Sequence, residues 1–348
     1  MPSLPAAVCL VAALLLALRG FTASPVPPEK FQKGITFTSW ETRRFALDSA
    51  VMSLKRLKAT GANWVAISIT GTQLTCDAQD ISQGVPRTPF DSDVRRLIAA
   101  AHRLKLRVLF RPVIAVTADP GRWHGEIGKD FTTEDAWASW FAAYEEFIIH
   151  YARLAAKTKV ELFCIGAELE GTTGREKDWR RIVAAVRHKY RGPLVYAANW
   201  SGELERIGWW DAVDFIGVNA YHPLSGSATP TVEELKTAWN ERGYVAALTA
   251  LAEKYNKPII LMEIGYRSVD RAALSPWDFE ANGPVNLTAQ ANAYQAALET
   301  FYHRPWIAGI YWWAWDLNPE GGGANDTGYT PQGKPAEWIL EQFYLGLR

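Results

Sequence analysis

The chain has 348 residues, 48% of them hydrophobic, with 37 Lys and Arg balanced by 37 Asp and Glu. This balance excludes the basic surface that nucleic acids or anionic membranes attract, and the hydrophobic content excludes a disordered chain. The 16 tryptophans are unusual. Because Trp is large, flat and polar at one edge, a surplus beyond the needs of the core suggests aromatic surfaces for a ligand such as a sugar.

The first segment is interpreted as a targeting signal. Residues 6–18 form an unbroken apolar run that is short for a membrane span, and a Pro-rich stretch at 25–28 follows it. A preceding basic residue and a clear cleavage site are both missing, so an uncleaved anchor is the alternative. We expect residues 1–24 to be a signal peptide and 25–348 to be one exported catalytic domain, secreted or periplasmic, without membrane contact once processed.

The cysteines do not form the pattern of a disulfide framework or of a metal site. Cys9 lies in the signal, Cys76 in a polar segment and Cys164 in an apolar run. A Cys76–Cys164 bridge is conceivable in an oxidising compartment. No metal or other cofactor is expected.

After the signal, short apolar runs alternate with longer amphipathic stretches. Continuous apolar runs of this length predict strands buried on both faces. The predicted strands are 34–37, 64–69, 107–110, 160–165, 194–198, 215–218, 259–262 and 307–312. The predicted helices are 45–60, 92–104, 133–157, 176–190, a short segment at 203–210, 231–255, 288–302 and 336–344. Eight such units in about 320 residues predict a single α/β domain, a (β/α)₈ TIM barrel. A doubly wound sheet is the alternative, but residues 38–41 (TSWE) lack its Gly-rich turn.

Two glutamates stand where predicted strands end, which is where barrel enzymes carry their chemistry. Glu168 follows the run at 160–165 and Glu263 follows 259–262. A carboxylate in such a place is costly unless it is paired or functional, and a salt bridge or a helix cap is the alternative for each. Two carboxylates facing each other across an aromatic cleft suit glycoside hydrolysis, and about 5 Å between them is expected for a retaining enzyme. Glu170 is the rival of Glu168 as the acid.

At these strand ends the chain resembles glycoside hydrolase family 113, β-mannanase-like barrels of a large clan with catalytic Glu after the fourth and seventh strands. The likeness covers nearly all of the chain beyond the signal. It is carried by the strings 89–93 (PFDSD), 101–106 (AHRLKL), 161–169 (ELFCIGAEL), 196–200 (YAANW), 214–221 (DFIGVNAY), 262–268 (MEIGYRS), 311–316 (YWWAWD) and 329–336 (YTPQGKPA).

The resemblance implies that Glu168 is the acid/base and Glu263 the nucleophile of a retaining hydrolase. Tyr221 is expected to hydrogen-bond the nucleophile, and Trp313 to form the floor beneath the sugar, unless Trp313 is a plain core residue. The other residues expected to line the cleft are Trp40, Trp200, Trp315, Asn199 and Asn219, with a turn role as the alternative for the two asparagines.

The chain departs from the family pattern at two places. Ala167 stands where the wider clan usually has Asn before the acid/base, and Arg111-Pro112-Val113 replaces a string like Lys-Pro-His. We interpret both changes as affecting the wall that binds sugar hydroxyls rather than the carboxylates. Asn199 or Asn219 is a candidate to replace the missing amide.

The expected activity is that of an endo-acting β-1,4-mannanase that cleaves mannan-type oligo- or polysaccharide by double displacement. Hydrolysis of another β-glycan, such as a glucan or a xylan, is the nearest alternative. A non-catalytic sugar-binding barrel is the alternative from another class, but it would be expected to lose one of the two glutamates.

Overall fold

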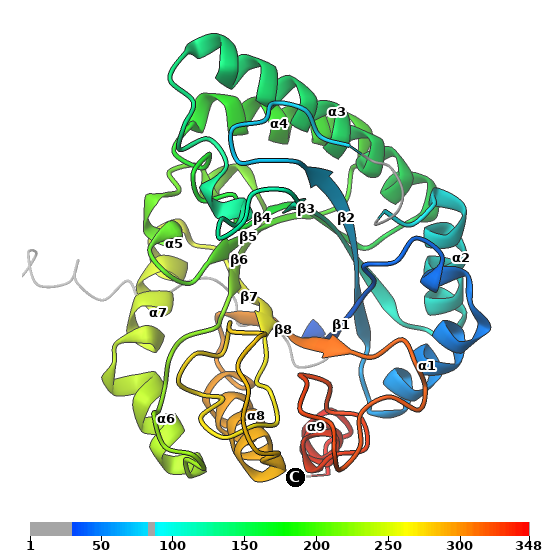
Figure 1. Ribbon diagram of the computed structural model, residues 1–348, viewed down its shortest axis with the longest axis vertical. Helices are drawn as coiled ribbons and strands as arrows, with labels where there is room; N and C mark the ends of the chain where they lie inside the picture. Colours follow the sequence, from blue (N-terminus) through cyan, green and yellow to red (C-terminus); the bar gives the residue numbers. More distant parts are fainter. Residues whose placement is uncertain (1–29, 83–87, 348) are drawn as a thin grey trace, which may run out of the picture.

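The computed structural model describes residues 30–82 and 88–347, so the expected signal at 1–24 lies outside the described residues. Eight parallel strands close into a barrel in chain order, and helices surround it (Figure 1). The strands are β1 (Gln32–Thr38), β2 (Trp64–Gln73), β3 (Arg107–Val116), β4 (Leu162–Ala167), β5 (Leu194–Asn199), β6 (Phe215–Asn219), β7 (Ile259–Ile264) and β8 (Ile307–Trp315). The predicted TIM barrel is confirmed.

The helices follow the predicted alternation. They are η2 (Arg44–Ala46), α1 (Asp48–Ala59), α2 (Asp91–Arg103), η3 (His124–Glu126), α3 (Glu134–Thr158), α4 (Glu176–Lys189), α5 (Glu203–Arg206), η4 (Trp210–Ala212), α6 (Val232–Glu241), α7 (Tyr244–Tyr255), α8 (Leu287–Phe301) and α9 (Pro335–Tyr344). The single helix predicted at 231–255 is two helices, α6 and α7. Gly243 separates them with a φ of 79°, a left-handed conformation that favours glycine.

Side chains alternate between the barrel interior and the layer beneath the helices. Inside the barrel, Trp64 and Tyr311 pack edge to face with ring centroids 6.5 Å apart. On the outer face of β8, Trp312 stacks on Tyr294 of α8 at 3.8 Å. The fully buried tryptophans of the described chain are Trp140, Trp179, Trp209, Trp210, Trp239, Trp312 and Trp315. A large share of the aromatic surplus therefore builds the core.

β2 and β3 continue beyond their predicted ends at 69 and 110, pairing as far as Gln73 and Val116. Gln73 is buried, but its amide oxygen accepts a hydrogen bond from the Trp140 indole at 2.9 Å and its amide nitrogen binds loop carbonyls. These satisfied bonds allow a polar residue to extend a buried strand. The loop that follows the longer β3 carries His124 in the short helix η3.

Cys76 and Cys164 are both buried and free, so the Cys76–Cys164 bridge is not formed. Burial raises the pKa of the Cys76 thiol to about 11. In the described part of the chain, no helix combines the length and apolar character needed to cross a membrane.

Gly34 in β1 gives a test of the barrel packing. A Cβ added there would lie 2.3 Å from the ring of Tyr311, the residue of β8 that pairs with Gly34. Since overpacking a filled interior costs about 1–3 kcal/mol, Gly34→Ala should lower the free energy of unfolding in urea by that amount. Gly174→Ala is the matched control, because an added Cβ there meets nothing within 4 Å. Equal losses in the two variants would contradict this account of the interior.

Candidate active site

Glu168 follows β4 in a backbone conformation that is unusual for its residue type. Its φ is 51°, and its amide donates to the carbonyl of Ala197 in β5 at 2.8 Å. The pairing of β4 with β5 shifts register just before this point. A left-handed non-glycine residue is strained, and such strain clusters at functional sites. The turn places the Glu168 carboxylate between Asn199 of β5 and His124 of η3, each 3.3 Å from one of its oxygens.

Glu263 lies within β7 and is held by two donors from other strands. The Tyr221 hydroxyl, just after β6, donates to Oε2 at 2.6 Å, and the Arg111 guanidinium of β3 pairs with Oε1. The side chains of Arg111 and Glu263 are only 3% and 9% exposed. The hydrogen bond expected between Tyr221 and Glu263 is therefore present, and it belongs to a buried ion pair.

The interpretation of Arg111 from the sequence is corrected by this contact. The Arg111-Pro112-Val113 string was interpreted as a change in the hydroxyl-binding wall alone. Instead, Arg111 touches the Glu263 carboxylate directly, and its guanidinium carbon lies 6.0 Å from the centre of the Trp313 ring. A basic residue inside a buried apolar strand was the sequence signal for this role.

The two carboxyl groups influence each other's ionisation. Burial raises the pKa of Glu263 above its ordinary value, and the Glu168 charge adds to this against the opposing charge of Arg111. Burial also acts to raise the pKa of Glu168, but the hydrogen bond and positive charge of His124, followed by the charge of Arg111, hold that pKa below its ordinary value.

Asn199 and Asn219 differ in what their amides do. The Asn199 side chain contacts Glu168, and its oxygen accepts from the backbone and hydroxyl of Ser201, both at 2.8 Å. Asn219 is fully buried beside Glu263 in the β6–β7 pairing; its amide makes no hydrogen bond of normal geometry, although its side chain lies close enough to Glu168 to help lower the pKa of that carboxyl. Buried polar atoms are rarely left unpaired, so the Asn219 amide is a candidate for a ligand hydroxyl.

Two of the expected tryptophans meet near Glu263. Trp40, after β1, and Trp313 of β8 have ring centroids 6.5 Å apart, and Trp40 is 49% exposed. The peptide bond from Trp313 to Ala314 is cis. Since Trp313 also borders Arg111, this pair offers an aromatic surface beside Glu263. Trp200, after β5, instead stacks on Trp277 of the loop between β7 and α8.

The expectation that Trp315 lines the cleft is wrong. Trp315 is 1% exposed, and its indole donates to the Ser53 hydroxyl of α1 at 3.0 Å. The pairing of β8 with β1 gives the reason. Ile35 pairs with Trp312 and Phe37 pairs with Trp315, so two steps along β1 correspond to three steps along β8. The extra residue in β8 is a bulge, and it turns Trp315 to the side that faces the helices.

Glu170, the rival for the acid role, forms an ion pair with Arg206 of α5. Glu203, at the start of the same helix, was not singled out in the sequence. Its buried carboxyl group accepts hydrogen bonds at 2.6 Å from the Tyr196 hydroxyl and from the backbone N–H of Asn199. The Tyr196 oxygen in turn accepts from the backbone N–H of Leu169 at 2.8 Å, next to Glu168. Glu203 thus supports Asn199, which contacts the Glu168 carboxylate, and Tyr196, which binds the backbone next to it.

His124 and Trp277 were also missed, because both lie in loops away from the predicted strand ends. As for metals, the His, Cys, Asp and Glu side chains at 30–82 and 88–347 form no group of three or more that could hold an ion.

Glu203 gives a pH-dependent test of stability. Burial raises its pKa from 4.5 to about 8, so the folded protein binds this proton more tightly than the unfolded chain does. The resulting stabilisation is complete below about pH 4.5 and is lost as the pH rises towards 8, by at most about 1.4 kcal/mol per unit. Glu203→Gln stays neutral, so its free energy of unfolding relative to the parent protein should rise steadily across this range.

Urea unfolding at several pH values between 5 and 8 measures this trend. Glu205→Gln, at an exposed position of the same helix, is the control and should run parallel to the parent protein. A parallel curve for Glu203→Gln as well would show that Glu203 is already ionised in the folded protein.

Comparisons with known proteins agree with this geometry. The family model described as Glycoside Hydrolase Family 113 matches residues 35–334. A solved complex of a GH113 β-1,4-mannanase is 27% identical, covers 90% of this chain and 99% of its own, and has a TM-score of 0.81. A GH113 β-mannanase from Alicyclobacillus acidocaldarius, solved in complex with ManMIm, is 30% identical, covers 91% and 98%, and has a TM-score of 0.79.

More distant structures share the fold alone. A β-D-glucuronidase from Dictyoglomus thermophilum is 16% identical with a TM-score of 0.58, and it covers 91% of this chain and 51% of its own. No curated protein matches the chain. Because the family model spans most of the sequence and the two carboxylates occupy the ends of β4 and β7, the chain belongs to glycoside hydrolase family 113 and is a glycoside hydrolase.

Proposed function

We propose that the chain is a retaining endo-β-1,4-mannanase that cleaves mannan-type polysaccharide by double displacement. Glu263 attacks the anomeric carbon and forms a glycosyl-enzyme while Glu168 protonates the leaving sugar oxygen. Glu168 then takes a proton from water, which attacks the anomeric carbon and releases Glu263. The observation that carries the proposal is the placement of these two buried carboxylates, held by His124, Arg111 and Tyr221, beside tryptophan surfaces at one end of the barrel.

The contacts of Glu263 suit a nucleophile. Arg111 and Tyr221 each bind one of its oxygens, so the carboxylate cannot rotate, and both contacts oppose the rise in pKa that burial causes. Each carboxylate oxygen has two lone pairs, so one remains for the new bond to the sugar. When the glycosyl-enzyme forms, Glu263 loses its charge and no longer pairs fully with Arg111. The ion pair therefore favours the return of the carboxylate in the second step.

The surroundings of Glu168 suit an acid that must also act as a base. Its side chain is 16% exposed, more than that of Glu263, and its partner His124 is itself partly exposed. In the empty cleft the His124 charge lowers the pKa of Glu168. A bound sugar excludes water from the carboxylate and disfavours its charged form, so substrate binding should raise this pKa when the acid is needed.

Two observations support mannan as the substrate. The similar solved structures are described as a GH113 β-1,4-mannanase and a GH113 β-mannanase, and they align over about nine-tenths of this chain. The unpaired Asn219 amide is placed beside Glu263, where it can bind a hydroxyl of the sugar under attack. This amide would compensate for Ala167, which replaces the usual asparagine before the acid/base.

We further propose that the protein is exported and that residues 1–24 act as the signal. The apolar run at 6–18 supports this, and so does the substrate, because a polysaccharide is met outside the cell. Sequencing the N-terminus of the protein recovered from the medium or periplasm tests the cleavage.

A panel of soluble mannan, glucomannan, β-glucan and xylan tests the function. Release of new reducing ends should be fastest on mannan, with internal cuts that lower its viscosity early. Proton NMR of the first product should show retained β-configuration, which is the outcome of double displacement through a glycosyl-enzyme. Faster action on glucan or xylan, or an inverted product, would contradict the proposal.

Truncation of each carboxylate separates the two roles. Glu263→Ala lacks the attacking atom and should lose at least about a thousandfold in kcat on every substrate. Glu168→Ala should still be glycosylated by dinitrophenyl β-mannobioside, because this phenolate leaves without a proton. Azide should rescue the two variants with opposite results, giving an inverted product with Glu263→Ala and a retained product with Glu168→Ala.

Glu170→Ala is the control and should keep most of the activity, because Glu170 is paired with Arg206. An inactive Glu170→Ala together with a nearly normal Glu168→Ala would move the acid/base role to Glu170.

His124 predicts a change in the pH profile. His124→Asn removes the hydrogen bond and the charge that lower the pKa of Glu168, so the alkaline limb of kcat/KM should move to higher pH. His150→Asn is the matched control, since His150 pairs with Asp91 instead. An unchanged alkaline limb in His124→Asn would mean that another group sets this limb.

A further inference from the structure

A second aromatic pair lies at the mouth, separate from Trp40 and Trp313. Trp277 stacks on Trp200 with ring centroids 5.3 Å apart and an angle of 30° between the rings. Trp200 also contacts the buried His222 ring at 5.3 Å. Trp277 is 46% exposed and makes no other ring contact within the described residues. One face of the Trp277 indole is therefore available to a ligand.

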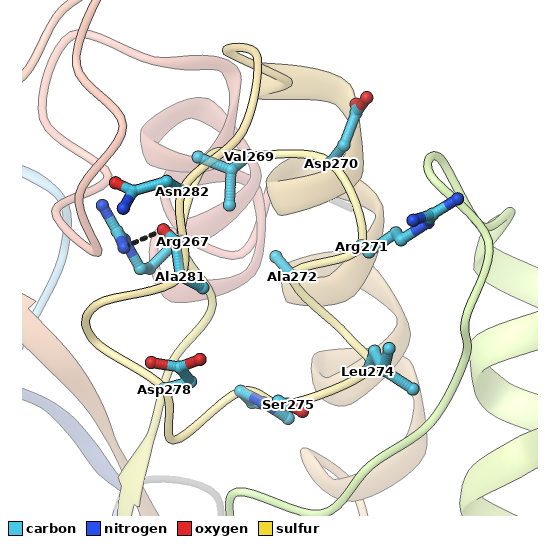
Figure 2. Close-up of a pocket in the computed structure, with 11 residues that line it drawn as sticks. Arg267, Val269, Asp270, Arg271, Ala272, Leu274, Ser275, Asp278, Ala281 and Asn282 are labelled. Carbon is cyan, nitrogen blue, oxygen red and sulfur yellow. Dashed lines mark hydrogen bonds between the residues drawn. The ribbon is translucent and has the colours of Figure 1, made fainter.

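The loop that carries Trp277 is held in place from both sides. Figure 2 shows Arg267 at its base, where the guanidinium donates to the carbonyl of Ala281, and a further bond reaches the carbonyl of Phe279 at 2.9 Å. The Tyr329 hydroxyl donates to the carbonyl of Pro276 at 2.7 Å. Trp277 thus sits between two fixed points of the backbone, so its ring is ordered before a ligand arrives.

These bonds close the loop around a pocket of about 210 Å³ that is distinct from the catalytic centre. Its lining consists of loop residues from Arg267 to Asn282, and neither Glu168 nor Glu263 is among them. The pocket thus belongs to the support of the loop and not to the reaction.

The neighbours of each tryptophan pair identify its side of the cleft. Trp200 directly follows Asn199, whose amide binds the Glu168 carboxylate at 3.3 Å. Because the acid protonates the oxygen of the leaving sugar, sugars beyond the cleaved bond extend past Glu168. The Trp40–Trp313 pair instead borders Arg111 and the nucleophile, where the attacked sugar is bound. The Trp200–Trp277 pair therefore lies on the leaving-group side.

We propose that Trp277, supported by Trp200, is a binding platform for a mannosyl unit on the leaving-group side of the cleaved bond. The open indole face would pack against the C–H face of the sugar ring. This inference rests on the proposed function and deepens it. A binding platform beyond the cleaved glycosidic bond favours cleavage at internal bonds of a long chain over cleavage at terminal ones.

The test compares two substrates that differ only beyond the cleaved bond. Mannohexaose can place sugars on the platform, whereas β-mannobiosyl fluoride releases a single atom and cannot reach it. Trp277→Ala should lower kcat/KM on mannohexaose by about tenfold and leave fluoride release within about twofold of the parent enzyme. Trp277→Phe, which keeps an aromatic face, should recover most of the loss.

Trp338→Ala is the matched control, because Trp338 is 55% exposed on α9 of the helical shell, and both activities should be unchanged. Equal losses of Trp277→Ala on both substrates would show a structural role, and no loss on either would show that no sugar binds there. Both results overturn the platform but leave the mannanase proposal standing. A parent enzyme inactive on both compounds would instead overturn the proposed function, and the platform with it.

Discussion

The buried ion pair between Arg111 and Glu263 is the interaction on which the catalytic end of the barrel depends. Its partners come from β3 and β7, and Tyr221 adds a hydrogen bond from the end of β6. Burying two charges is costly, and the pair is tolerated because each charge compensates the other. Removing one partner would leave an unpaired buried charge, so the three strands must keep their relative positions. The closed barrel fixes those positions without relying on a flexible loop.

Glu168 is held differently, and the difference matches the two roles. Its backbone is in the strained left-handed region, and its carboxylate faces the partly exposed His124 rather than a buried cation. Behind it, Glu203 binds Tyr196 and Asn199, which fix the turn while leaving the carboxylate open to the cleft. A nucleophile benefits from a fixed position and a stabilised charge. An acid/base needs access to the leaving group and to water, and its surroundings must allow its protonation state to change.

The sequence predicted the elements that depend on local pattern. Buried strands give apolar runs, so the barrel and the positions of Glu168 and Glu263 at the ends of two strands could be deduced. Contacts across the barrel could not, since the pairing of Arg111 with Glu263 depends on which side of β3 meets the interior. Trp315 was misplaced because its position near the end of a strand was taken to put it in the cleft, whereas a bulge that no residue type announces turns it towards the helices. His124 and Trp277 lie in loops, whose course is set by tertiary contacts.

The opposite pKa shifts of the two carboxyl groups are a consequence of the same arrangement. Burial raises the pKa of Glu263, and His124 lowers that of Glu168, which is the reverse of what an acid at Glu168 and an ionised nucleophile at Glu263 need. A sugar that displaces water from Glu168 shifts this balance, because desolvation penalises the carboxylate that has the weaker charge compensation. Glu263 keeps Arg111 and Tyr221 throughout. In the proposed mechanism, substrate binding would therefore favour the protonated form of Glu168 over that of Glu263.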